Sequence, residues 1–136
     1  MDVIALIGRI LFVIMFLNSG VKHLRQREGL VAYARSAGGP APELMVPLTG
    51  VMLLAGGALV ALGLWPDLGA LLLVAFLLPT AYYMHGFWRV EDPQMRTMQE
   101  THFWKNVSLA GASLLLFALF VECGDQLGLM AGGPLF

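Results

Sequence analysis

Residues 44–64 read LMVPLTGVMLLAGGALVALGL, and residues 68–88 read LGALLLVAFLLPTAYYMHGFW. A transmembrane helix needs roughly 20 predominantly apolar residues to cross the hydrocarbon layer of a bilayer. Both stretches reach this length without an aspartate, glutamate, lysine or arginine, and only Trp65, Pro66 and Asp67 separate them. Proline and aspartate suit the first turn of a helix, so the two stretches predict an antiparallel pair of membrane-spanning helices joined by a tight turn.

Two further apolar stretches flank this pair, at residues 3–21 and 103–121. Hydrophobic residues make up 58% of the chain and charged residues only 12%, which is too little polar surface for a water-soluble domain. No basic residue precedes the first stretch, so it is interpreted as a retained span rather than a signal peptide. We therefore expect an all-α integral membrane protein, a single domain (residues 1–136) in which four helices form an antiparallel bundle.

The longer connections carry local signals of their own. Residues 28–36 contain an apolar run before a segment rich in glycine and proline, which predicts a short helix lying at the inner membrane interface. In the last connection, Asp92 followed by Pro93 is typical of a helix N-cap and first turn. The fourth helix is therefore expected to begin near Pro93 and to continue to Gly124. Gly50, Gly56 and Gly57 are predicted positions of close helix packing.

The net charge of −1 argues against nucleic acid as a partner. The basic residues of the chain are nevertheless concentrated at the first and third connections: Lys22, Arg25, Arg27, Arg35, Arg89, Arg96 and Lys105. Because basic loops remain on the cytoplasmic side, both connections are predicted to be cytoplasmic and both termini to lie outside. This pattern predicts a multi-pass protein of the inner (plasma) membrane, with the lipid bilayer as its first partner.

Arg9 is a charged residue within the first span, about 10 Å from its outer end at the helical rise per residue. An ionisable group at this depth has to pair, reach the interface or face a cavity. Glu122 and Asp125 near the end of the fourth span are candidate ion-pair partners, and binding of an anionic or carbonyl-bearing ligand is the alternative.

A second group of polar residues is expected at similar depth at the cytoplasmic end of the bundle. Tryptophan, tyrosine and lysine anchor many membrane proteins at the interface, but that role does not account for the amide and imidazole side chains. We therefore predict a ligand-binding site here. Its candidate residues are Asn18, Lys22, His85, Trp88, Lys105 and Asn106, with Arg9 as an additional candidate nearer the other end.

Other chemistries receive little support from the residue spacing. His23, His85 and His102 could form a three-histidine site, and Met95, Met98 and His102 share one helix face, but neither set has a diagnostic metal-ligand spacing, so no metal is predicted. No catalytic motif is present, which leaves enzymatic activity open. Cys123 has no partner for an internal disulfide, and is interpreted as a small residue at a helix end rather than a redox cysteine.

The order of several short motifs resembles the DoxX family of small four-helix membrane proteins. These motifs are Gly8 to Val13 and Asn18 to Lys22 in the first span, the loop from Tyr33 to Pro42, Leu48 to Gly50 and Gly56 to Leu64 in the second span, His85 to Trp88, and Phe103 to Asn106. The resemblance covers most of the chain, from about Arg9 to Leu116. Many members carry a glutamate just before the paired glycines, where this chain has Met52, Leu53 and Leu54.

The resemblance implies a link to redox chemistry, since the family is named after a component of a quinone-linked oxidase. The first functional hypothesis is thus an accessory or quinone-interacting component of a membrane redox system, with quinone as the candidate ligand and a membrane or peripheral redox protein as partner. The alternative is a non-catalytic adaptor or assembly factor that binds another membrane protein. A homo-oligomer is compatible with both, and a four-span transporter would require dimerisation.

Overall fold

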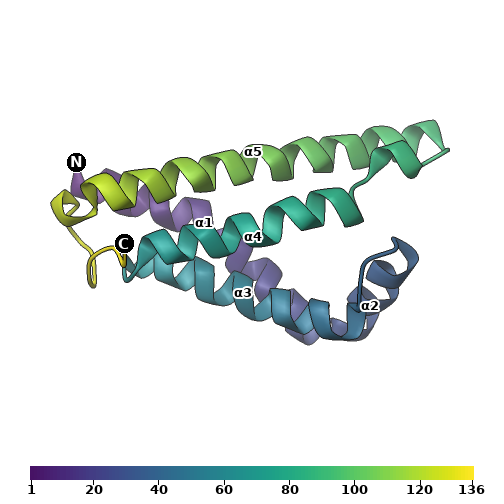
Figure 1. The fold of residues 1–136 in the computed structure, drawn as a ribbon, viewed down its shortest axis with the longest axis horizontal. Helices are drawn as coiled ribbons and strands as arrows, with labels where there is room; N and C mark the ends of the chain where they lie inside the picture. The colour runs from purple at the N-terminus through teal and green to yellow at the C-terminus, as the bar shows by residue number, and fades with distance from the viewer.

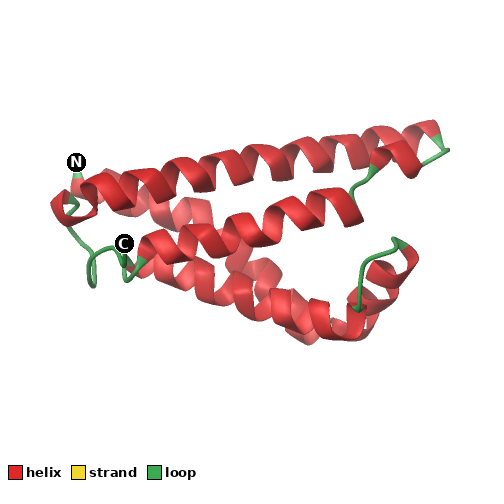
Figure 2. Cartoon of the chain, viewed as in Figure 1, coloured by secondary structure: helices red, strands yellow, loops and turns green.

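The computed structural model describes residues Met1–Phe136 and is built of α-helices without a strand. The elements are α1 (Asp2–Arg25), α2 (Arg27–Ser36), α3 (Pro42–Leu62), α4 (Pro66–Met84), the 3-10 helix η1 (Phe87–Arg89), α5 (Pro93–Cys123) and the 3-10 helix η2 (Gly124–Gln126). Four segments, built on α1, α3, α4 and α5, are long and apolar enough to cross a membrane. Figures 1 and 2 show these helices as an antiparallel bundle, as the sequence predicts.

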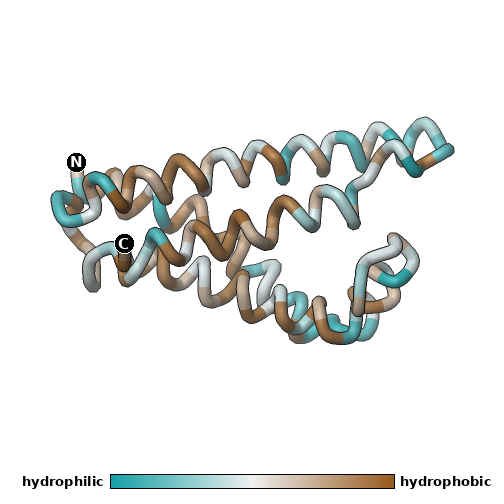
Figure 3. Tube along the Cα trace, viewed as in Figure 1, coloured by the Kyte–Doolittle hydropathy of each residue, from teal (hydrophilic) through white to brown (hydrophobic).

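The bundle has two distinct ends. Both chain termini and the α3–α4 turn lie at one end, which we call the terminal end, and α2 and η1 lie at the other, which we call the basic end (Figure 1). Hydrophilic residues are concentrated towards the ends of the helices, including the first turns of α5, while the middle of the bundle is hydrophobic (Figure 3). This distribution matches the polarity profile of a bilayer.

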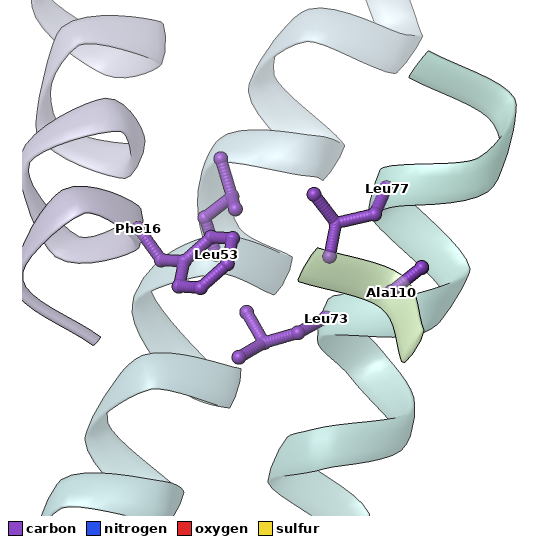
Figure 4. Packing of buried hydrophobic residues seen from close by; sticks show 5 residues of the cluster. All are labelled: Phe16, Leu53, Leu73, Leu77 and Ala110. Carbon is purple, nitrogen blue, oxygen red and sulfur yellow. The ribbon is translucent and has the colours of Figure 1, made fainter. Parts of the chain in front are cut away.

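Neighbouring helices pack in the order α1, α3, α4 and α5, and α2 packs against α3. The central core is formed by Phe16, Leu53, Leu73, Leu77 and Ala110, which come from all four long helices (Figure 4). α1 and α5 separate towards the basic end, where α5 runs along one edge of the molecule and α1 approaches α2 (Figure 1). At the basic end α1 therefore lies beside α2 and not beside α5.

Glycines allow α3 and α4 to approach each other closely. A Cβ atom added to Gly56 would lie 3.0 Å from the carbonyl oxygen of Gly69, and one added to Gly69 would lie 2.8 Å from that of Gly56. Helices in lipid associate largely through such close packing, because the hydrophobic effect does not drive them together. The prediction that Gly50, Gly56 and Gly57 occupy packed positions is confirmed, since all three are buried.

The helix ends follow partly from local sequence. The Asp92 carboxylate accepts a hydrogen bond from the backbone N–H of Met95 at 2.9 Å, and α5 begins at Pro93. α4 ends at Met84, and the last residues of the predicted third span form η1 instead. The carbonyl groups at this end accept hydrogen bonds from Arg89 in η1 and from the distant Tyr33 in α2, and Tyr33 also lines the candidate site.

Candidate functional site

The last carbonyl groups of α4 are capped by two side chains. Such groups have no donor within their own helix. Arg89 Nη2 donates to the carbonyl oxygens of Tyr82 and Tyr83 at 2.5 and 3.1 Å, and the Tyr33 hydroxyl donates to that of Met84 at 3.2 Å. A cation is also favourable at a helix C-terminus because of the helix dipole. Arg89 and Tyr33 thus end α4 and fix α2 beside it.

Between these elements lies a cavity of about 460 Å³ at the basic end. All five α-helices contribute to its lining, which includes apolar residues such as Phe16 and Phe76. The lining residues with a polar group are Asn18, Ser19, Lys22, His23, Tyr33, Thr49, Thr80, Tyr83, His85, Lys105 and Asn106. Small-molecule sites are typically mostly apolar cavities of this size with a few polar groups. The cavity therefore has the general character of a ligand site.

Asn106 is the polar cavity residue that is most deeply buried. It lies on the packed face of α5, one turn before Ala110, and its exposed fraction is 7%. Its side-chain amide makes no hydrogen bond within the protein, whereas the buried Ser113 hydroxyl donates to the carbonyl of Leu109 at 2.9 Å. Asn106 lines the cavity, and its amide atoms are not enclosed by protein, in contrast to Arg9 Nε. The amide of Asn106 is therefore available to a molecule in the cavity.

His85 lies opposite on α4's C-terminal side and is half-buried. Its Nδ1 is 2.7 Å from Oε1 of Gln99, and its ring lies 5.2 Å from that of His102, centroid to centroid. Gln99 Nε2 in turn lies 3.5 Å from the Tyr33 hydroxyl, and Lys105 Nζ lies 3.4 Å from His102 Nδ1. A chain of polar contacts thus links α2, α5 and the end of α4.

The predicted site residues fall into two groups. Asn18, Lys22, His85, Lys105 and Asn106 all line the cavity, and of these Asn18, Lys22 and Lys105 are exposed. Two predicted residues do not line it. They are Trp88 and Arg9.

Trp88 belongs to an aromatic cluster on the outside of the basic end. Its ring lies 5.3 Å from that of Phe87, 5.5 Å from that of Phe103 and 5.7 Å from that of Tyr82, and 45% of the residue is exposed. This arrangement is typical of an aromatic belt at a membrane interface. Trp88 therefore has the position of an anchor and not of a ligand contact.

Arg9 is buried at the terminal end, with an exposed fraction of 4%. Its Nη2 donates to the carbonyl oxygen of Leu129 at 2.7 Å, its Nη1 donates to Met130 Sδ at 2.6 Å, and its Nε has no partner. The candidate ion pair with Glu122 or Asp125 is not formed. The protein's one ion pair joins Arg35 to Glu43 at the opposite end. Arg9 is therefore held by two uncharged groups of the C-terminal segment.

That C-terminal segment, residues 127–136, folds back over the terminal end (Figure 1). The fully buried carboxylate of Asp67 accepts hydrogen bonds from the backbone N–H groups of Leu135 and Phe136 at 2.9 Å. The backbone of Ala131 donates to the carbonyl of Leu62 at 2.9 Å. Asp67 and Arg9 are thus structural anchors of this segment, which closes the end of the bundle away from the cavity.

The structure does not assemble the three-histidine site considered above. His23 packs edge-on against Phe76 at 5.9 Å, and its Nδ1 lies 2.8 Å from the carbonyl oxygen of Ser19, whereas the ring of His85 packs against that of His102. No group of three histidine, cysteine, aspartate or glutamate side chains is arranged to hold a metal ion. Cys123 is a free, half-buried cysteine.

Comparison with known proteins assigns the family. Residues 4–86 match the family described as DoxX, which is more than half of the chain. The chain belongs to the DoxX family. It is also 35% identical over 114 residues to the inner membrane protein YphA of Escherichia coli, an alignment that covers 84% of this chain and 81% of YphA. No solved structure matches the chain.

The DoxX match ends at residue 86, so it includes His85 but not Asn106.

Two residues of this DoxX protein that shape the site, Tyr33 and Gln99, were not predicted from the sequence. A signal for Gln99 was present, because Gln99, His102 and Asn106 are spaced by three and four residues and share one helix face. Tyr33 had no such signal, since its partner Met84 is 51 positions away.

Proposed function

We propose that this small DoxX membrane protein binds the head group of a lipophilic quinone in the basic-end cavity and acts as an accessory component of a membrane redox system. The observation that carries the proposal is the amide of Asn106 in the cavity lining, which has no hydrogen-bond partner within the protein although the residue is only 7% exposed. A carbonyl or hydroxyl oxygen of a quinone head group would supply the missing hydrogen-bond partner. The family link to quinone-dependent oxidation supports the same ligand class.

The shape of the bundle supports a ligand that arrives from the membrane. α1 and α5 diverge towards the basic end, and the cavity is lined by residues of both, including Met15, Asn18 and Asn106. An apolar tail could therefore remain between helices while the polar head group contacts His85 and Asn106. We place the basic end in the cytoplasm on the basis of its positive charge, which locates the head group near the cytoplasmic interface.

The test is extraction of the purified protein followed by mass spectrometry of the lipid fraction. We expect a quinone or quinol in the wild-type extract and its loss when His85 and Asn106 are both replaced by alanine. Trp88→Ala serves as the control, because Trp88 lies outside the cavity. Wild-type extracts without any such molecule, from membranes that contain quinones, would overturn the proposal.

A second candidate, a membrane adaptor, is favoured by the first turns of α5. Residues 93–98 of α5 are all exposed, including Met95 and Met98 at 46% and 45%. A helix end without packing partners within its own chain offers a contact surface. If the protein is an adaptor, a partner membrane protein is expected to copurify with it in mild detergent. The double substitution Met95→Ser/Met98→Ser is expected to abolish this copurification. A preparation containing only this chain under all growth conditions would argue against it.

A further inference from the structure

The hydrogen bond to the backbone carbonyl of Met84 determines which group donates and which accepts in the polar contacts at the cavity wall. A backbone carbonyl can only accept hydrogen bonds. The Tyr33 hydroxyl, 3.2 Å away, is the donor to this oxygen. The single hydroxyl proton of Tyr33 is therefore used here, and the hydroxyl oxygen can only accept from its other neighbour.

That neighbour is the side-chain amide of Gln99. Because the Tyr33 oxygen acts as an acceptor, the Gln99 group that faces it, at 3.5 Å, has to be the donor Nε2. The carbonyl oxygen Oε1 of Gln99 then faces His85, at 2.7 Å from Nδ1. The orientation of the Gln99 amide thus follows from the hydrogen bond between Tyr33 and the Met84 carbonyl.

His85 is the last residue in this series of hydrogen bonds. Oε1 of Gln99 can only accept, so Nδ1 of His85 carries the proton that it receives. A neutral imidazole has one N–H group, which leaves Nε2 with a lone pair. Nε2 makes no hydrogen bond within the protein, and His85 lines the cavity. The imidazole therefore presents a hydrogen-bond acceptor to a ligand.

From this order of donors and acceptors we infer that the cavity prefers a head group bearing a hydroxyl. The hydroquinone form therefore binds more tightly than the quinone. This inference rests on the proposed function. The amide of Asn106 both donates and accepts, so it contacts either form. His85 Nε2 accepts from a hydroxyl but opposes a carbonyl oxygen, since both carry lone pairs. Tyr33 and Gln99 act as positioning residues that determine which form is favoured.

The experiment compares the affinities of an alkyl-substituted benzoquinone and its hydroquinone, kept reduced under anaerobic conditions, for the protein in lipid nanodiscs. One additional hydrogen bond corresponds to about a tenfold preference for the hydroquinone. Gln99→Leu removes the acceptor at Nδ1 and is expected to reduce the preference to about one.

Two matched controls are present in the chain. Gln94→Leu makes the same change at an exposed position of α5, and Tyr82→Phe makes the same change as Tyr33→Phe on a tyrosine whose hydroxyl has no partner. Both controls are expected to retain the wild-type preference, whereas Tyr33→Phe reduces it. A merely structural role for Gln99 or Tyr33 would weaken both forms equally and leave their ratio unchanged.

The outcomes separate the inference from the proposed function. Equal affinity for both forms, or tighter binding of the quinone, overturns the inference and leaves quinone binding intact. Absence of binding by either form overturns both. If Gln99→Leu does not fold, the ¹⁵N chemical shifts of His85 in the wild-type protein provide the test, with the signals assigned by their absence in His85→Gln. A protonated Nδ1 and an unprotonated Nε2 support the inference, and the reverse pattern overturns it.

Discussion

Asn106 is a residue whose side chain is expected to contribute to binding rather than to folding. The residue is only 7% exposed and lines the cavity, and its amide has no hydrogen-bond partner within the chain, so an apolar replacement breaks no hydrogen bond of the protein. We predict that Asn106→Leu leaves the free energy of unfolding unchanged or raises it, while quinone affinity falls about tenfold. Denaturant titration and calorimetric binding measure the two effects. A clear loss of stability with unchanged affinity would instead assign the amide a structural role.

Substitution of Arg9 is expected to loosen the C-terminal segment. Because its guanidinium holds Leu129 and Met130, we predict that Arg9→Gln increases amide hydrogen exchange of the segment, for example at Ala131, by about tenfold. Quinone binding at the other end of the bundle is expected to remain unchanged. Glu122→Gln is the control, since Glu122 forms no ion pair with Arg9. Faster exchange in the control to the same degree would contradict the assigned partners.

The ends of the helices differ in how far local sequence determines them. The start of α5 follows from two adjacent residues, Asp92 and Pro93, and the structure places the helix start there. The end of α4 depends on Tyr33 and Arg89, and the anchoring of the C-terminal segment depends on contacts across about 120 positions. Such contacts use backbone carbonyls as acceptors. Because every residue has a carbonyl, these contacts have no signature in the residue pattern.

The capped end of α4 provides a prediction at the level of the element. Arg89→Gln removes the cation and the donors to the carbonyls of Tyr82 and Tyr83. We expect a loss of about 1–2 kcal/mol in the free energy of unfolding, from lost hydrogen bonds and the helix dipole interaction. Arg96→Gln, an exposed position on α5, is the control. Equal stability of the two variants would show that the cap contributes little.

For the molecule as a whole, hydropathy was sufficient to predict four spans and the tight α3–α4 hairpin, because the bilayer imposes the length of each apolar stretch. The position of each residue along its membrane span also predicted that Asn18, His85 and Asn106 lie at one end of the bundle. There they line the cavity. The cavity itself depends on the divergence of α1 and α5, a property of packing between helices. Periodicity within one helix does not encode it, so Trp88 could not be separated from the cavity residues in advance.

The orientation of the bundle is a prediction for the whole molecule. The basic residues of α2 and of the α4–α5 connection are expected to hold the basic end in the cytoplasm. A green fluorescent protein fused after Phe136 is therefore expected to be dark, and alkaline phosphatase fused there active. Fusions within the α2–α3 connection, near Gly38, should give the opposite pattern. Bright fluorescence of the C-terminal fusion would contradict the predicted orientation.

The location of the quinone site can be measured by photo-crosslinking in native membranes. A photoreactive quinone analogue is added to membranes containing the protein, and the labelled peptides are identified by mass spectrometry, with excess unlabelled quinol as competitor. Competed labelling is predicted at cavity-lining segments of α1, α4 and α5, around Asn18, His85 and Asn106. Labelling confined to the terminal end around Arg9, or labelling that the competitor does not reduce, would contradict a quinone site in the basic-end cavity.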